Sequence, residues 1–279
     1  MNVDITLPDG SVRNYESPVT GYQIAESIGP RLLKDAICVE IDNKFQDLSY
    51  EISESINIRI VTTKDLDALH ILRHSSAHIL AQAVLNLYPN AQFGVGPSIE
   101  NGFYYDFLFE SPIKENGLEN IEKEMKRIAK SAQSFIRSEI TKKDAVKIFR
   151  NQKLKLELIE SAESDEGVGE EIVSTYANDE FIDLCMGPHV PSTSVLKHFK
   201  LTKVSGAYWR GDESNVQLQR IYGTSWFSKE DLDQYLIQQE EAEKRDHRKL
   251  GNELDLFTSS EELGSGNFLW KPKGAVLRD

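Results

Sequence analysis

The sequence is poor in the features that mark secreted and membrane-bound chains. It has only two cysteines, and Cys38 lies within an apolar strand pattern, so a disulfide framework is not indicated. The N-terminus lacks a basic segment followed by an apolar run, and the most apolar stretch, residues 79–88, is too short to span a bilayer. We therefore expect a cytoplasmic protein with no membrane partner.

Positive charge is also scarce, because 32 Lys and Arg face 45 Asp and Glu, a net charge of −13. That balance argues against a nucleic-acid partner, since such binding depends on Lys and Arg displacing counterions. Residues 121–155 are an exception: they hold 11 basic against 4 acidic residues, which leaves 21 against 41 elsewhere. This stretch indicates either a local basic face for RNA or an ordinary solvated helix face.

The first 62 residues predict a small α+β unit. Alternating apolar residues flank the turn Pro8-Asp9-Gly10, which indicates a hairpin over residues 3–16. Thr20 and Gln23 have capping-box spacing for a helix that ends at Gly29-Pro30. Further strands are expected at 36–41 and 56–60. The order strand, strand, helix, strand, strand is typical of a β-grasp, ubiquitin-like fold, with a domain boundary near residue 62.

A larger α+β part is expected to follow. The pattern predicts the elements in this order: a helix from 63 to Tyr88, a glycine-rich turn at 94–102 leading into an aromatic strand, an amphipathic helix over 119–137, a half-buried strand at 154–158, an acidic loop at 161–171, and strands at 181–184, 199–204 and 216–222. A polar connector helix should run from Ser228 to Lys249. Residues 251–279 are too few for an independent domain.

Two pairs of residues, far apart in the sequence, carry the types that perform chemistry. His74 and His78 lie four residues apart in a helical pattern, so both imidazoles should point the same way. Gly187-Pro188 cannot lie inside a helix, so Cys185 and His189 should flank a tight turn. Together the two pairs predict a four-residue site.

The residue types alone leave the chemistry of this site open. Three histidines and a cysteine match a tetrahedral zinc site, although the catalytic glutamate of the His-Glu-x-x-His motif is missing, since serines occupy positions 75 and 76. A metal-free pocket could also hydrolyse an ester: an imidazole would activate water, Lys155 would stabilise the oxyanion and Asp183 would hold a substrate ammonium group. The simpler alternatives are a solvated strand lysine and a turn-capping aspartate. His70, His198 and His247 have no evident partners.

The chain resembles the N-terminal region of bacterial threonyl-tRNA synthetases over essentially its whole length. This resemblance implies a TGS domain at 1–62, an editing domain at 63–226, a linker helix at 227–250 and the start of a truncated class II aminoacylation domain at 251–279. It depends on five stretches that occur in the family's order and spacing: RHSSAHILAQAV, GPSIENGFYYDF, DLCMGPHVPST, SGAYWRGD and QRIYGTSW.

The resemblance implies that the chain edits mischarged tRNA by hydrolysing serine esterified to threonine tRNA. The partners would be the 3′ acceptor end of that tRNA and its L-serine ester, with Tyr104 and Gly96 in contact with the substrate. The catalytic residues carried over from the family are His74, His78, Lys155, Asp183, Cys185 and His189.

The resemblance also bears on cofactors and oligomeric state. The related alanyl-type editing domain uses such a cluster for zinc, whereas the threonyl type works without it, so we expect no metal in this chain. ATP, magnesium and zinc would serve only the aminoacylation domain, most of which lies beyond Asp279, so ligase activity and a homodimer are expected only of a full-length protein. Two rivals stay open: a non-catalytic RNA-binding or regulatory module, and a zinc-dependent hydrolase of a small substrate.

Overall fold

The computed structural model describes residues 2–161, 171–259 and 267–278. The chain divides into two compact units, Met1–Ser228 and Lys229–Asp279. The predicted acidic loop at 161–171 lies almost entirely outside the described residues. Within the described ranges, no helix is long and apolar enough to cross a membrane.

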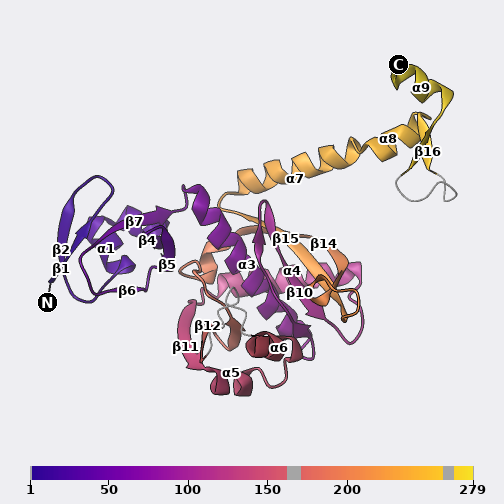
Figure 1. Ribbon diagram of the computed structural model, residues 1–279. Helices are drawn as coiled ribbons and strands as arrows, with labels where there is room; N and C mark the ends of the chain where they lie inside the picture. Colours follow the sequence, from indigo (N-terminus) through magenta and orange to yellow (C-terminus); the bar gives the residue numbers. More distant parts are fainter. Residues whose placement is uncertain (1, 162–170, 260–266, 279) are drawn as a thin grey trace. The chain divides into compact units, whose positions relative to one another are not determined.

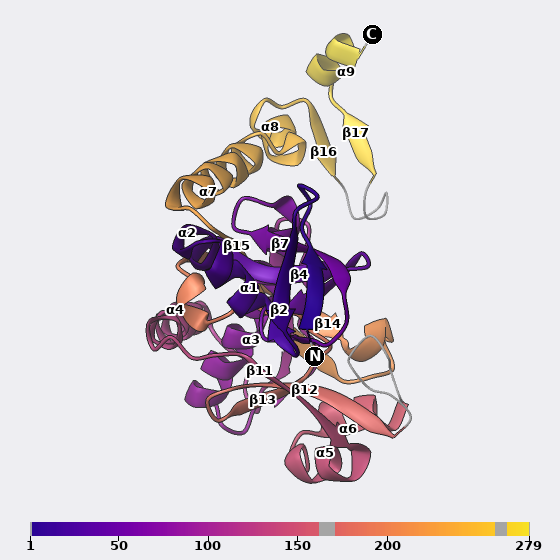
Figure 2. The same cartoon turned by 90° about the vertical axis from the view of Figure 1, so that its left-hand side faces the viewer.

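The N-terminal part of the first unit is a five-stranded sheet in the order β2-β1-β7-β4-β5, and α1 packs against it (Figures 1 and 2). Strands β1 and β2 form the predicted hairpin, whereas β1 and β7 are parallel. The capping box of Thr20 and Gln23 is present at the start of α1. The predicted α+β, β-grasp fold is therefore confirmed. Its elements are β1 (Asn2–Thr6), β2 (Val12–Glu16), β3 (Val19–Thr20), α1 (Gly21–Ile28), α2 (Pro30–Asp35), β4 (Ala36–Ile41), β5 (Lys44–Asp47), β6 (Glu51–Ile52) and β7 (Ile56–Thr62).

The larger part contains two antiparallel sheets. Helix α3 packs against β10 and β15 of the sheet β14-β15-β10-β8, and α4 packs beside α3 (Figure 1). The second sheet, β11-β12-β13, has α5 beside it. The elements are α3 (Leu66–Leu87), β8 (Gln92–Phe93), β9 (Ser98–Ile99), β10 (Gly102–Leu108), α4 (Glu115–Lys130), β11 (Ile136–Thr141), α5 (Lys142–Ile148), α6 (Lys153–Ser161), β12 (Ile172–Asn178), β13 (Phe181–Leu184), β14 (His198–Tyr208) and β15 (Gln217–Trp226).

The hydrophobic core continues across the predicted boundary at residue 62. Ile37, Cys38 and Val61 of the β-grasp part belong to the same buried cluster as Ala68 and Ile71 of α3. Residue 62 is therefore where the last strand of the β-grasp sheet ends, before helix α3. The β-grasp part and the larger part pack against each other as one unit. Cys38 is a core residue, as its strand pattern predicted.

Two predicted elements of the larger part are wrong. The amphipathic helix expected over 119–137 ends at Lys130, because Ala132 has a left-handed backbone with φ of 54° and a strand begins at Ile136. The strand expected at 154–158 is helix α6. Leu154 and Leu158, four residues apart, are both buried on one helix face, and an alternation of only five residues fits either period.

The second unit begins with the predicted polar helix, but that helix is interrupted. Helix α7 (Lys229–Lys244) ends, and a second helix, α8 (His247–Glu253), begins after it. The N-cap residue of α8 is Asp246, whose side chain accepts a hydrogen bond from the Arg248 backbone N–H. The hairpin of β16 (Phe257–Ser259) and β17 (Phe268–Trp270) and the short α9 (Pro272–Arg278) follow. The described residues between 251 and 278 thus contain regular structure and belong to the same compact unit as the predicted linker.

The cations of the basic stretch 121–155 do not lie on a single element. Lys126, Arg127, Arg137 and Lys147 each pair with an acidic residue of the same stretch, so these pairs leave its net charge unchanged. The four cations are distributed over α4, β11 and α5, and Lys155 is buried. The stretch is therefore weaker evidence for one RNA-binding face than its composition suggested.

Close contact between β10 and β15 predicts the effect of one substitution. A Cβ at Gly102 would collide with the carbonyl oxygen of Gly223, which is backbone and cannot rotate away. We expect Gly102→Ala to lower the free energy of unfolding by about 1–3 kcal/mol, measured by urea denaturation. Gly29→Ala is the control, because no atom lies near its Cβ position, and a change within about 0.5 kcal/mol is expected. Equal losses in both variants would contradict the explanation.

Candidate hydrolytic site

Helix α3 brings two imidazoles to one face. The ring centroids of His74 and His78 are 5.0 Å apart, with the planes at 69°. Between them, Ser75 and Ser76 each donate a hydrogen bond to the carbonyl four residues earlier, at 2.8 Å. Their hydroxyl hydrogens are therefore used within the helix, which leaves the oxygen of Ser75 able to accept from other groups.

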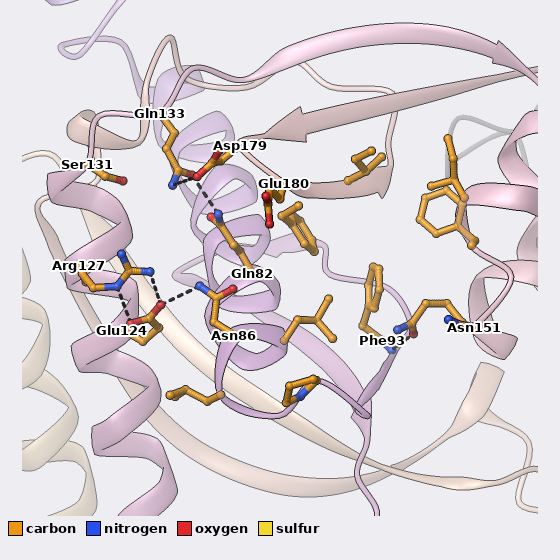
Figure 3. Close-up of a pocket in the computed structure, with 18 residues that line it drawn as sticks. Gln82, Asn86, Phe93, Glu124, Arg127, Ser131, Gln133, Asn151, Asp179 and Glu180 are labelled. Atoms are coloured by element: carbon orange, nitrogen blue, oxygen red, sulfur yellow. Dashed lines mark hydrogen bonds and ion pairs between the residues drawn. The ribbon is translucent and has the colours of Figure 1, made fainter.

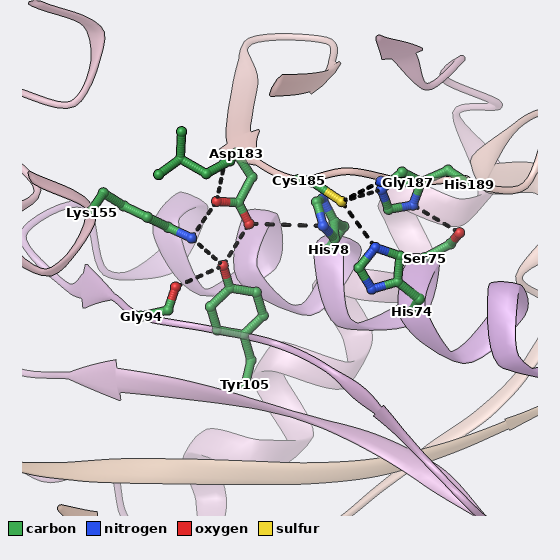
Figure 4. Close-up of polar contacts among 11 residues, drawn as sticks. His74, Ser75, His78, Gly94, Tyr105, Lys155, Asp183, Cys185, Gly187 and His189 are labelled. Atoms are coloured by element: carbon green, nitrogen blue, oxygen red, sulfur yellow. Dashed lines mark hydrogen bonds and ion pairs between the residues drawn. The ribbon is translucent and has the colours of Figure 1, made fainter. Parts of the chain in front are cut away.

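The turn after β13 brings the second pair to the same place (Figure 4). The Cys185 Sγ lies 3.0 Å from the His74 Nε2 and 3.3 Å from the His189 Nε2. The His189 ring stacks on that of His74, with centroids 4.5 Å apart. Gly187 makes the turn possible, since it has φ of 76° and a side chain there would collide with the Tyr176 hydroxyl. The two pairs, more than a hundred residues apart, meet as predicted.

Hydrogen bonds to Ser75 determine the tautomer of His189. The Ser75 Oγ donates to the Ile71 carbonyl, accepts from the Val190 N–H at 3.0 Å, and lies 3.0 Å from the His189 Nδ1. Because the hydroxyl hydrogen is already used, Nδ1 must carry the hydrogen in this contact. The Nε2 of His189 therefore has a lone pair toward Cys185. The single thiol hydrogen can satisfy only one of the two imidazoles beside it.

Burial keeps the three imidazoles neutral. It lowers the pKa of His74 to about 4, with a smaller contribution from His70, while a hydrogen bond with the Gly96 backbone opposes the shift. Burial also lowers the pKa values of His78 and His189 well below the ordinary value, and the neighbouring imidazoles add to the effect. Neutral imidazoles can accept a proton from water, which is what a general base requires.

A buried ion pair lies beside the imidazoles. The Lys155 Nζ lies 2.5 Å from the Asp183 Oδ1, and the Tyr105 hydroxyl donates to the Asp183 Oδ2, also at 2.5 Å. Lys155 is fully buried on α6, so the interpretation as a solvated strand lysine is wrong. Burial raises the pKa of Asp183, and the contact with Lys155 opposes that rise. Asp183 is more than a turn cap: it carries this pair and lies 3.9 Å from the His78 Nε2.

These residues surround a cavity of about 180 Å³. Pockets that bury whole drug-sized molecules have about 300–1,000 Å³, so this one takes only a small group. The predicted residues that line it are His74, His78, Gly96, Asp183 and Cys185. His189 contacts the cluster from behind, and Lys155 lies behind Asp183.

The two tyrosines of the aromatic strand β10, Tyr104 and Tyr105, point to opposite faces of the sheet. Tyr105 is buried and lines the cavity with its ring against Gly96, where a Cβ would collide with that ring. Tyr104 lies on the other side of the strand, with the Arg220 guanidinium 3.9 Å from its ring centroid. Tyr104 does not line the cavity, and its contact with substrate stays a prediction.

Tyr105 and His70 are among the lining residues that sequence reasoning missed. The His70 Nε2 lies 2.8 Å from the Ser98 Oγ at the same cavity. Its position four residues before His74 was the signal that could have found it, since it continues the spacing of His74 and His78. No comparable signal distinguished Tyr105 from Tyr104, because only the strand register decides which one faces inward.

A larger cavity of about 900 Å³ lies further along α3 (Figure 3). Its labelled polar groups largely bond to one another: Glu124 with Arg127 and Asn86, and Gln82 with Gln133. It lacks the imidazole and thiol groups of the smaller cavity. We therefore place the chemistry in the smaller cavity.

The residue types in this cluster are those that bind metal ions such as zinc. Ligand atoms of His74, His78, Cys185 and His189 all lie within 4.8 Å of one another, and among the described side chains the buried His78 Nδ1 has no hydrogen-bond partner. Around a tetrahedral zinc, sulfur and nitrogen ligands lie about 3.5 Å apart. The two shorter sulfur–nitrogen distances of 3.0 and 3.3 Å are instead those of thiol–imidazole hydrogen bonds.

The lowered pKa values predict how stability depends on pH. Below about pH 6.5 the unfolded chain takes up protons on these histidines before the folded chain does, so the free energy of unfolding should fall as the pH is lowered toward 4. His74 contributes over the interval from about 6.5 to about 4. We expect His74→Gln to show a smaller loss of stability between pH 7 and pH 5 in urea denaturation. An equal loss in the variant would exclude His74 as a contributor.

Comparison with known proteins connects this geometry to two families. Residues 3–62 match the TGS domain, and residues 173–222 match the threonyl and alanyl tRNA synthetase second additional domain. The latter range includes Asp183, Cys185 and His189.

The whole chain is similar to proteins named threonine–tRNA ligase. The one from Burkholderia multivorans is 53% identical over 278 residues, which cover 99% of this chain and 43% of the relative. The one from Burkholderia ambifaria is 52% identical with the same coverage. The chain thus spans less than half the length of the curated relatives it matches. It combines a TGS domain with the editing domain of threonyl and alanyl tRNA synthetases, in the arrangement of the N-terminal part of threonine–tRNA ligases.

Proposed function

We propose that residues 63–226 hydrolyse the ester that joins serine to the 3′ end of threonine tRNA. The observation that carries this proposal is the small cavity lined by neutral imidazoles beside a thiol. The match to a tRNA synthetase editing domain supports tRNA as the partner. The cavity would take the aminoacyl group, and the terminal ribose would remain at its opening.

An imidazole would activate the water. His74 and His189 both present Nε2 to Cys185. We assign the ring hydrogen of His74 to Nδ1, in which case the single thiol hydrogen leaves one of these two Nε2 atoms with a free lone pair. His74 is the partly exposed member, so its Nε2 is the better placed to take a proton from water. The hydroxide attacks the ester carbonyl carbon, the bond to the ribose oxygen breaks, and the proton passes to that oxygen. The products are serine and a tRNA with a free terminal ribose hydroxyl.

Asp183 would receive the ammonium group of the substrate. Its carboxylate lines the cavity together with Tyr105, whose hydroxyl bonds to it, and Lys155 contacts the carboxylate from behind. In this arrangement Lys155 opposes the rise in the pKa of Asp183 that burial causes, and we assign it this supporting role. The oxyanion role expected for Lys155 would require its ammonium to leave the ion pair, so it stays a prediction.

The expected selectivity is a matter of size. A hydrophobic contact distinguishes one methyl group by only about 1–3 kcal/mol, so a synthetic site accepts some serine in place of threonine. A second, hydrolytic site that admits the smaller ester and excludes the larger one removes the error. We propose that contact with the cavity wall excludes the threonyl methyl group.

The remaining expectations are proposals of the same kind. Hydrolysis is proposed to need no metal or other cofactor. The ligase activity named for the relatives, with its ATP, magnesium and zinc and a homodimer, is proposed only for a longer protein. A cytoplasmic location likewise stays a prediction.

The proposal predicts the outcome of a deacylation assay. Threonine tRNA carrying labelled serine or labelled threonine is incubated with the chain, and the loss of label is followed over time. We expect the seryl ester to disappear at least about tenfold faster, the ratio that one methyl group provides. Equal rates for the two esters would refute the size sieve.

The same assay separates hydrolysis from an RNA-binding module. The double variant His74→Ala, Cys185→Ala should lose at least about 100-fold in rate, because general-base catalysis contributes 10²–10⁴-fold. Its tRNA affinity, measured by filter binding, should be unchanged. Unchanged hydrolysis in the double variant would show that the His74 and Cys185 cluster is structural. Binding of tRNA by the wild-type chain without hydrolysis would favour the non-catalytic RNA-binding module.

Metal analysis tests the zinc-hydrolase alternative. Protein purified without chelators should contain well under one zinc per chain, and hydrolysis should survive dialysis against a chelator. Stoichiometric zinc that is lost together with activity on chelation would establish the rival, because a catalytic zinc site depends on the ion.

A further inference from the structure

One carboxylate of the β-grasp part is bonded to the turn that carries His189. Asp47 is the last residue of β5. Its Oδ1 accepts a hydrogen bond from the His189 backbone N–H at 2.9 Å, and its Oδ2 accepts one from the Tyr176 hydroxyl at 2.5 Å. Both donors belong to the editing domain, more than 120 residues further along the chain.

Tyr176 extends this contact to the cavity. It is 1% exposed on β12, and its ring lies edge-on to that of His189, with centroids 4.5 Å apart. Its hydroxyl also lies where a side chain at position 187 would be. Asp47 therefore holds both the backbone of His189 and the ring that packs against its imidazole and the Gly187 turn.

The position of His189 matters because its imidazole contacts most of the cluster. It lies against the Cys185 thiol, stacks on His74 and Phe135, and bonds to Ser75. A shift of the backbone at His189 would move the thiol contact and the stacked ring of His74 together. Misplacement of catalytic groups by about 1 Å can cost about 100-fold in rate.

We infer that Asp47 is a positioning residue of the hydrolytic site, supplied by the TGS domain. It does not touch the cavity, and it acts by fixing His189 and Tyr176. The inference rests on the proposed function for its kinetic consequence, although the structural consequence at His189 is independent of the substrate. It makes the TGS domain part of the editing machinery, in addition to any contact of that domain with RNA.

Substitutions at Asp47 in the full chain separate positioning from charge. Asp47→Ala leaves two buried donors without an acceptor, and we expect kcat for seryl-tRNA hydrolysis to fall about 10- to 100-fold with KM changed less than about threefold. Asp47→Asn should keep most of the rate, because its amide oxygen can accept from the His189 N–H and its amide nitrogen can donate to the Tyr176 oxygen. Glu16→Ala, at an exposed position of the same domain, is the control with unchanged rate.

A spectroscopic readout tests the placement of His189 directly. The imidazole NMR signal of His189, assigned by comparison with His189→Gln, should shift in Asp47→Ala at a fixed pH of 7 and stay near the wild-type position in Asp47→Asn. Wild-type kcat and an unshifted signal in Asp47→Ala would overturn the inference.

Two further outcomes are decided in the same way. If Asp47→Ala does not fold, Tyr176→Phe replaces it: that variant keeps the bond to His189, a several-fold loss of kcat is expected, and an unchanged kcat overturns the inference. If the wild-type chain does not hydrolyse seryl-tRNA, the proposed function fails. In that case the NMR signal of His189 in Asp47→Ala tests the positioning role by itself. A shifted signal supports the role, and an unshifted signal contradicts it.

Discussion

The hydrogen bonds between α3 and the Cys185 turn are the interaction on which the site depends. Ser75 donates within its helix and accepts from the Val190 N–H and the His189 imidazole, so one hydroxyl fixes both the turn and a tautomer. Because the cluster is buried, its imidazoles stay neutral. The chemistry that we propose places the ring hydrogen of His74 on Nδ1, so that one imidazole lone pair beside Cys185 is left to accept a proton from water.

A second constraint concerns the buried ion pair of Lys155 and Asp183. An isolated carboxylate at the cavity wall would bind a proton, since burial disfavours its charged form. Lys155 and the Tyr105 hydroxyl both bond to Asp183, and these contacts oppose the rise in its pKa that burial causes. Such a pair contributes little net stability, because desolvation offsets most of the attraction. We propose that the pair serves to present the Asp183 carboxylate at the cavity.

The β-grasp part is joined to the editing domain by polar as well as apolar contacts. Core residues on both sides of residue 62 pack together, and Asp47 bonds to two groups of the editing domain. The size sieve that we propose, which admits one aminoacyl group and excludes another that differs by a methyl, requires cavity walls that are held in place. We propose that contacts from the β-grasp part help to hold them.

The sequence by itself determined the features that depend on local periodicity and turn chemistry: the β-grasp order, the capping box of α1, the histidine spacing of α3 and the Gly187-Pro188 turn. Only the tertiary structure decided the identity of α6, the burial of Lys155, the inward position of Tyr105 and the contact of Asp47. Each of these depends on which distant segment packs against the residue, or on a strand register. A short alternation of apolar residues fits both a helix and a strand, and burial is a property of packing that no local spacing records.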